Sequence, residues 1–344
     1  LVAAPVNIEA NGSDTSVVTL TLRDSNNNPV TGQTVAFTST LGTLGNVTEQ
    51  ASGLYTATLT AGTVSGVASL SVSVGGNALG VTPATVTLNG DSGNLSTTNS
   101  TLVAAPVNIE ANGSDTSVVT LTLRDSNNNP VTGQTVAFTS TLGTLDNVTE
   151  QASGVYTATL TAGTVSGVAS LSVSVGSSAL GVTPATVILN GDSGNLSTTN
   201  STLVAAPVNI EANGSDTSVV TLTLRDNNNN PVTGQTVAFT STLGTLDNVT
   251  EQASGLYTAT LTAGTVSGIA SLSVSVNSSA LGVTPATVTL NGDSGNLSTT
   301  NTTLVAAPVN IEANGSDTSV VTLTLRDSNN NPVTGQTVAF TSTL

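Results

Sequence analysis

The feature that most constrains this sequence is a repeat with a period of 101 residues. The string LVAAPVNIEANGSDTSVVTLTLRD begins at Leu1, Leu102, Leu203 and Leu304, and these positions start repeats 1 to 4. The 344 residues therefore hold three full repeats and the first 41 residues of a fourth. A unit of this length has the size of one domain, whereas solenoid repeats are about 20–45 residues long. The sequence predicts a tandem array of similar domains.

Within one repeat, hydrophobic and polar residues alternate with a period of two, which is typical of half-buried β-strands. Val18, Leu20 and Leu22 alternate with Thr19 and Thr21. Similar runs occupy residues 5–8, 35–37, 55–59, 68–74 and 81–88, and the last is interrupted by Pro83. With a short strand near Val47 this gives about seven strands. The predicted fold class is all-β, with tandem immunoglobulin-like β-sandwich domains of about seven strands in a linear array.

We expect domain boundaries in the short polar stretch between repeats. This gives Ig-like domains at residues 1–94, 95–195 and 196–296, and an incomplete N-terminal half of a fourth at 297–344. We expect little free linker, because Ser100–Val103 already has the pattern of a strand. Half a sandwich leaves an open hydrophobic face. We therefore expect this sequence to be a slice of a longer array, with any signal peptide outside it.

The composition excludes several classes of function. There are 4 basic residues against 20 acidic ones, and the chain has no Lys, His, Cys, Met or Trp. The chain therefore lacks His-based acid–base catalysis, thiol nucleophiles and the usual zinc ligands, so we do not expect an enzyme. Four Arg on an acidic chain cannot form a nucleic-acid-binding surface. No stretch approaches the roughly 20 apolar residues that span a bilayer, so we expect no membrane contact.

The strand order brings acidic loops of consecutive repeats to the same junction. Asp14 and Asp91 of repeat 1 are expected to face Asp125 and Glu150 of repeat 2, with Arg124 beside them. One hypothesis is an inter-domain calcium ion, because calcium takes 6–8 oxygen ligands. Its candidate ligands are Asp14, Asp91, Asp115, Asp125, Glu150, Asp192, Asp226 and Glu251. The alternative, which ordinary turn chemistry favours, is a set of solvated loops with an exposed Arg–carboxylate pair worth about 0–1 kcal/mol.

Tyr55 is the one tyrosine of repeat 1. It could form a platform on which a sugar stacks. Its place in an alternating strand favours instead a core position or a tyrosine corner, in which the hydroxyl bonds to backbone upstream.

Four motifs in order carry a resemblance to a known family. They are Ala4–Asp14, Val18–Val35, Gly53–Thr63 and Val81–Leu88. Together they resemble the group 1 bacterial Ig-like domains of the intimin/invasin (inverse autotransporter) adhesins, over essentially all of each repeat. The resemblance implies a cell-surface protein anchored in the outer membrane through a part not present here, in which Ig-like domains form a stalk.

Two non-enzymatic functions follow from this reading. In the favoured one, the repeats are a structural stalk that projects an adhesive tip, and their partners are neighbouring Ig-like domains of the same chain. In the other, the repeats themselves bind a host, matrix or neighbouring-cell surface. The second reading requires an exposed apolar or aromatic patch, for which this composition offers few residues.

Overall fold

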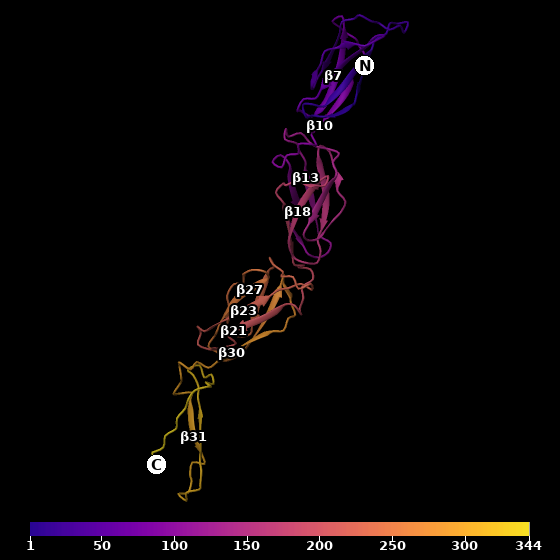
Figure 1. The fold of residues 1–344 in the computed structure, drawn as a ribbon. Helices are drawn as coiled ribbons and strands as arrows, with labels where there is room; N and C mark the ends of the chain where they lie inside the picture. The colour runs from indigo at the N-terminus through magenta and orange to yellow at the C-terminus, as the bar shows by residue number, and fades with distance from the viewer. Residues whose placement is uncertain (344) are drawn as a thin grey trace. The chain divides into compact units, whose positions relative to one another are not determined.

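The structure is a computed structural model that describes residues 1–343, and among these residues it contains strands and no helix (Figure 1). No described segment is therefore a helix that could cross a bilayer. The chain divides into two compact units, which comprise residues 1–109, 113–163 and 167–189 in unit 1, and residues 110–112, 164–166 and 190–344 in unit 2. The junction between repeats 1 and 2 lies within unit 1, and the other two junctions lie within unit 2.

Repeat 1 forms ten strands. They are β1 (Val2–Ala4), β2 (Asn7–Glu9), β3 (Thr15–Thr21), β4 (Val35–Ser39), β5 (Thr43–Leu44), β6 (Thr48–Glu49), β7 (Leu54–Thr60), β8 (Gly66–Val74), β9 (Asn77–Ala78) and β10 (Ala84–Asn89).

The following repeats form the same series. Repeat 2 contains β11 (Thr101–Ala105), β12 (Asn108–Glu110), β13 (Thr116–Thr122), β14 (Val136–Ser140), β15 (Thr144–Leu145), β16 (Thr149–Glu150), β17 (Val155–Thr161), β18 (Gly167–Val175), β19 (Ser178–Ala179) and β20 (Ala185–Asn190). Repeat 3 contains β21 (Thr202–Ala206), β22 (Asn209–Glu211), β23 (Thr217–Thr223), β24 (Val237–Ser241), β25 (Thr245–Leu246), β26 (Thr250–Glu251), β27 (Leu256–Thr262), β28 (Gly268–Val276), β29 (Ser279–Ala280) and β30 (Ala286–Asn291). Repeat 4 contains β31 (Thr303–Ala307) and β32 (Val320–Thr324).

Each full repeat is a sandwich of two five-stranded sheets. One sheet has the order β1-β3-β7-β5, with β6 also pairing with β7, and the other has the order β2-β10-β8-β4, with β9 pairing with β8. Repeats 2 and 3 have the same two orders. Only β5, β6 and β9 are two residues long, so seven strands of repeat 1 have three residues or more. The predicted tandem Ig-like sandwich of about seven strands is confirmed.

Two strand predictions need correction. The run through Pro5 and Ile8 is not one strand: β1 ends at Ala4 and β2 begins at Asn7, and the two strands pair in different sheets. The last strand begins at Ala84, not at Val81. Proline has no N–H to give to a ladder, so both Pro5 and Pro83 lie outside the strands that flank them.

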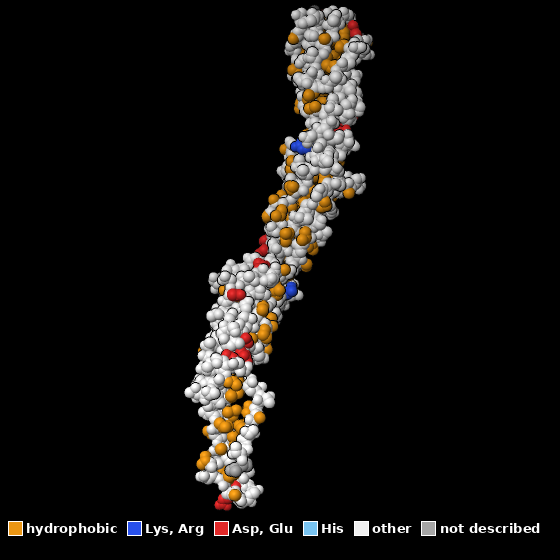
Figure 2. Space-filling view, turned by 90° about the vertical axis from the view of Figure 1, so that its left-hand side faces the viewer, with side chains coloured by type: hydrophobic (Ala, Val, Ile, Leu, Met, Phe, Trp, Pro, Cys, Tyr) orange, Lys and Arg blue, Asp and Glu red, His pale blue; other side chains and the backbone are white. Residues whose placement is uncertain are grey.

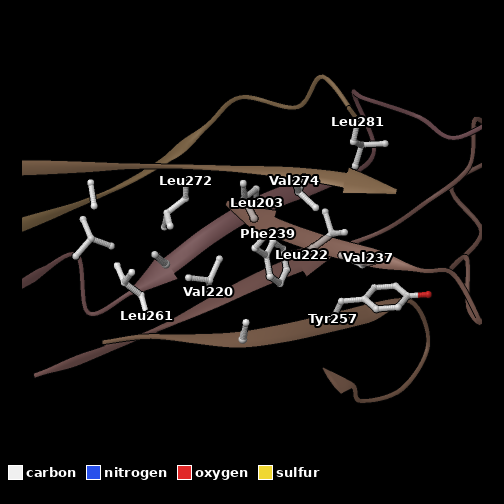
Figure 3. Packing of buried hydrophobic residues seen from close by; sticks show 14 of the residues in the cluster. Leu203, Val220, Leu222, Val237, Phe239, Tyr257, Leu261, Leu272, Val274 and Leu281 are labelled. Atoms are coloured by element: carbon white, nitrogen blue, oxygen red, sulfur yellow. The ribbon is translucent and has the colours of Figure 1, made fainter. Parts of the chain in front are cut away.

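The alternation of β3 places one set of side chains in the core and the other on the surface. Val18 and Leu20 are at most 1% exposed, while Thr15 and Val17 face outward. Figure 3 shows the equivalent core of repeat 3, where Leu222, Phe239 and Tyr257 lie between the strands. Burying one such side chain contributes about 1.5–3 kcal/mol to stability.

Tyr55 belongs to this core and also ties a loop to it. Its side chain is 2% exposed, its hydroxyl donates to the carbonyl of Val30 at 3.2 Å, and it accepts from the N–H of Gln33 at 3.1 Å. The prediction that Tyr55 is a core residue bonded to upstream backbone is confirmed.

Over its described residues 304–343, repeat 4 has one pair of strands, β31 and β32, which correspond to β1 and β3. Residues that correspond to core positions are therefore exposed: Phe340 is 55% exposed, whereas its equivalent Phe37 is 9% exposed. Hydrophobic side chains accordingly gather on the surface of this C-terminal segment (Figure 2).

Candidate functional site: the junctions between repeats

The loop that opens toward the junction is organised by one aspartate. In repeat 2, Oδ1 of Asp125 accepts hydrogen bonds from the backbone N–H groups of Asn127 (2.9 Å) and Asn129 (2.8 Å). Oδ2 accepts from the side-chain amide of Asn129 at 2.8 Å. Asn128 completes the turn with φ of 67°, a left-handed conformation that asparagine tolerates. The sequence Asp-Ser-Asn-Asn-Asn-Pro therefore folds into a compact loop with its own hydrogen bonds.

Repeat 1 reaches into this loop at two places. The backbone N–H of Asp91 donates to Oδ2 of Asp125 at 2.9 Å. The side chain of Asn129 accepts from the N–H of Ser65 at 2.9 Å and donates to the carbonyl of Thr63 at 3.0 Å. We call these five residues, Thr63, Ser65, Asp91, Asp125 and Asn129, the junction clamp. Asp125 is 0% exposed and Asn129 is 6% exposed, so the carboxylate and amide at the centre of the clamp are shielded from water.

The chain that connects the two repeats is bonded to the same loop. Leu95 forms a β-bridge with Asp125, and the N–H of Ser96 donates to the carbonyl of Arg124 at 2.9 Å. The side chain of Asn99 donates to the carbonyl of Asp125 at 3.0 Å. The short connection is therefore held by the repeat that follows it.

Gly90 brings the backbones of the two repeats into direct contact. A Cβ atom at this position would lie 2.4 Å from the carbonyl oxygen of Pro130 and 3.0 Å from Cγ2 of Val131. No side chain fits in that space, so glycine is required by the close approach of the neighbour. Val131 is 0% exposed at this contact.

The junction clamp recurs in unit 2 with equivalent residues and nearly equal distances. Between repeats 2 and 3, Asp226 accepts from Asp192 N at 3.0 Å, and Asn230 bonds with Thr164 and Ser166 at 2.9 Å each. Between repeats 3 and 4, Asp327 accepts from Asp293 N at 3.0 Å, and Asn331 bonds with Thr265 and Ser267 at 2.9 Å each.

The electrostatics of the buried aspartate favour its ionised form. Burial by itself raises the pKa of Asp125, but the amide of Asn129 and the N–H groups of Asp91, Asn129 and Asn127 outweigh it. The pKa of Asp125 is therefore lowered from its ordinary value, as are those of Asp226 and Asp327 for the same reasons. The carboxylate therefore stays ionised at neutral pH, and the surrounding N–H dipoles stabilise its negative charge.

Of the predicted junction residues, the structure brings Asp91 to Asp125 and Asp192 to Asp226. Asp14 instead accepts from Glu9 N and the Asn11 amide at 3.0 and 2.8 Å, within its own repeat. Its equivalent Asp115 accepts through its carbonyl from Ala162 at 2.8 Å.

The predicted glutamates also bind within their own repeats. Glu150 accepts from the N–H of Gly133 at 2.9 Å, and Glu251 accepts from that of Gly234 at 3.1 Å. The guanidinium of Arg124 donates to the carbonyl of Asn128 in its own loop at 2.9 Å. Within residues 1–343 no group of three or more acidic side chains is arranged to hold a metal ion. Each oxygen of Asp125 already accepts two hydrogen bonds, and calcium at the junctions stays a prediction.

The junction contacts of Asn129, the loop 63–65 and Gly90 were not predicted from the sequence. A signal for the loop was available: β8 runs antiparallel to β10, so the loop that enters β8 lies at the same end of the sandwich as the exit after β10. The asparagine and glycine give no such signal, since both residue types are ordinary in turns.

A comparison with protein families decides the relationship. The model of the family "Invasin, domain 3" matches residues 1–91, 96–192, 197–293 and 298–344. The chain belongs to this family.

Three solved structures agree with this membership. InvD of Yersinia pseudotuberculosis is 46% identical with a TM-score of 0.57, over 69% of this chain and 73% of InvD. FdeC, an Escherichia coli adhesin, is 26% identical with a TM-score of 0.64, over 85% of this chain and 96% of that one. Invasin, described as a bacterial integrin-binding protein, is 28% identical with a TM-score of 0.54, over 88% of this chain and 60% of that one. The chain is thus homologous to domains of bacterial adhesins.

Proposed function

We propose that this chain is a segment of the stalk of a bacterial surface adhesin, in which tandem Ig-like domains hold an adhesive tip away from the cell. The complete protein is extracellular and anchored in the outer membrane through a part outside this segment. The segment acts by position and has no catalytic role, which its lack of His, Cys and Lys supports.

The observation that carries the proposal is the junction clamp. It occurs at all three junctions with the same residue types, and it joins hydrogen-bonding groups of one repeat to a buried carboxylate and amide of the next. A fixed junction lets the reach of the adhesin grow with the number of repeats, whereas flexible linkers give a reach that grows only with the square root of length. We place the domain boundaries after Asn94, Asn195 and Asn296, because Leu95, Leu196 and Leu297 bridge to the following repeat.

A second candidate function is direct binding by the repeats. It is favoured by an exposed apolar pair on repeat 2, where Val168 and Ile188 are 57% and 43% exposed. The two residues are partners on adjacent antiparallel strands, so their side chains lie side by side on the outer face of the sheet.

One experiment separates the two candidates. Versions of the complete adhesin with repeats removed or added are displayed on cells, and the height of the tip is measured by atomic force microscopy. Purified residues 1–344 are tested in parallel for binding to host cells and matrix proteins. The stalk proposal expects height to follow repeat number and no binding by the purified chain. Micromolar or tighter binding by the purified chain, together with a tip height that does not change with repeat number, would instead support direct binding by the repeats.

A further inference from the structure

Beyond the junction, the strand order ties the beginning of each repeat to its end. β2, near the start of repeat 1, pairs in parallel with β10, the last strand, with Asn7, Ile8 and Glu9 opposite Thr87, Leu88 and Asn89. β2 is at the edge of its sheet and has no other partner strand there. Repeats 2 and 3 have the same strand order.

Hydrogen bonds extend this pairing at both ends. The N–H of Thr87 donates to the carbonyl of Val6 at 2.8 Å, and the N–H of Ala10 donates to the carbonyl of Asn89 at 2.7 Å. Ala10 is 0% exposed, so water does not compete for its hydrogen bond.

A side-chain contact fastens the exit of the chain just beyond β10. The carboxylate of Glu9 accepts from the N–H of Ser92 at 3.2 Å and from the hydroxyl of the same serine. We call this pair the latch. The equivalent pairs are Glu110 with Ser193 and Glu211 with Ser294. The latch joins the entering and leaving segments of one repeat by a charge-assisted hydrogen bond.

The parallel arrangement decides how tension acts on these bonds. A repeat in a stalk is pulled at its two chain ends, so β2 is drawn in one direction and β10 in the opposite one. Both strands run the same way, and their hydrogen bonds cross from strand to strand. Tension therefore slides the strands along each other and loads the whole set of bonds at once, instead of opening them one at a time.

Building on the proposed stalk function, we propose that β2, β10 and the latch form the load-bearing element of each repeat, which resists unfolding when an attached cell is pulled. The sandwich core determines the equilibrium stability in the absence of force, whereas this element determines how fast the repeat unfolds when force is applied.

The test is single-molecule force spectroscopy on the full chain held at its two ends. The latch variant carries Glu9→Ala, Glu110→Ala and Glu211→Ala. A matched control carries Glu49→Ala, Glu150→Ala and Glu251→Ala, because those glutamates also accept from backbone N–H groups but lie away from β2 and β10. Guanidinium unfolding without force shows that each variant folds and how far its equilibrium stability changes.

We expect the latch variant to unfold roughly tenfold faster than the parent at constant force, which corresponds to a barrier lower by about 1.4 kcal/mol. Any loss of stability measured without force is first subtracted from this difference. The control should unfold at nearly the parental rate. Equal rates for the two variants, or a latch variant that matches the parent, would overturn the proposal. The stalk function is judged separately by the dependence of tip height on repeat number, so either idea can fail while the other stands.

Discussion

The sequence Arg-Asp-Ser-Asn-Asn-Asn-Pro occurs at residues 23–29, 124–130 and 326–332. In this structure residues 23–29 are exposed, whereas residues 124–130 contact repeat 1 and residues 326–332 contact repeat 3. The internal hydrogen bonds agree: Asp24 binds Asn26 N and Asn28 N at 2.9 and 2.8 Å, as Asp125 binds their equivalents. The surroundings differ, because Asp24 and Asn28 are exposed while Asp125 and Asn129 are buried. The internal hydrogen bonds of the loop are thus the same whether or not a preceding repeat contacts it.

This preformed shape has an energetic consequence. Association usually costs about 0.5–1.5 kcal/mol for each side chain that must be immobilised. Asn28 is already bonded to Asp24 through its amide at 3.0 Å, so much of that ordering is complete in the free loop. The neighbour adds burial and bonds from Thr63, Ser65 and Asp91 to an arranged surface. If the contacts of the neighbour matter, a substitution in the buried loop destabilises the protein more than the same substitution in the exposed loop.

The largest effect is expected from removing the buried carboxylate. Asp125→Ala leaves the N–H groups of Asp91 and of the buried Asn129 without their acceptor, at a cost of about 3 kcal/mol or more. Asp24→Ala removes the same local bonds where water can replace them. Guanidinium unfolding of the full chain should show a clear loss for the first variant and a much smaller one for the second. Equal losses would show that the neighbour contributes nothing.

A somewhat smaller effect is expected at the amide. Asn129→Ala removes the bonds to Thr63 and Ser65 and should lower the free energy of unfolding by about 1–3 kcal/mol. Its matched control is Asn28→Ala, which removes the same residue from the exposed loop. Calorimetry of the two variants measures the difference, and indistinguishable melting profiles would contradict the role of Asn129 as a junction residue.

Acid should weaken the junctions gradually. The folded pKa of Asp125 is lowered, so its contribution is present above the unfolded pKa of about 3.9 and is lost as pH falls through the lower folded value. Asp226 and Asp327 behave alike. We expect stability to be level near neutral pH and to fall below about pH 4, with a shallower fall in Asp125→Asn. A thermal-melting series across pH checks this, and stability that rises on acidification would contradict it.

The smallest effect is expected from chelation. Asp125 already has four hydrogen-bond donors around its two oxygens, so its role at the junction does not require calcium. Adding EDTA should leave the melting temperature and hydrodynamic radius unchanged. A fall in melting temperature that calcium restores would instead establish the inter-domain calcium hypothesis.

The sandwich was predictable because its determinants are local and repeated. Val18 and Leu20 lie on one face by the period of a strand alone, and the 101-residue period sets the domain unit. The split between β1 and β2 could not be predicted, because the pattern around Pro5 does not show that the chain passes from one sheet to the other there.

The junction was predictable only in part. Strand order placed the loops of Asp91 and Asp125 at the same junction, and they do meet there. It could not show that Asp14 and Glu150 bind N–H groups of their own repeats, because a nearby backbone donor competes with any distant partner. Nor could it show the contact at Gly90, which depends on how closely two folded domains approach.

The rigidity of the junction between repeats 1 and 2 can be measured directly. The chain has no cysteine, so Ala36→Cys and Ala137→Cys, both on exposed strand faces, place one spin label on each of repeats 1 and 2. Pulsed electron paramagnetic resonance then measures the distribution of distances between them. We add Gly90→Ala, whose Cβ would meet Pro130, and as a control Gly62→Ala, whose Cβ has no neighbour closer than 4.0 Å.

A fixed junction predicts a single narrow distribution for the parent and for Gly62→Ala, and a broad one for Gly90→Ala. A broad distribution in the parent, or a narrow one that Gly90→Ala does not change, would contradict the claim that the junction clamp holds consecutive repeats in a fixed arrangement.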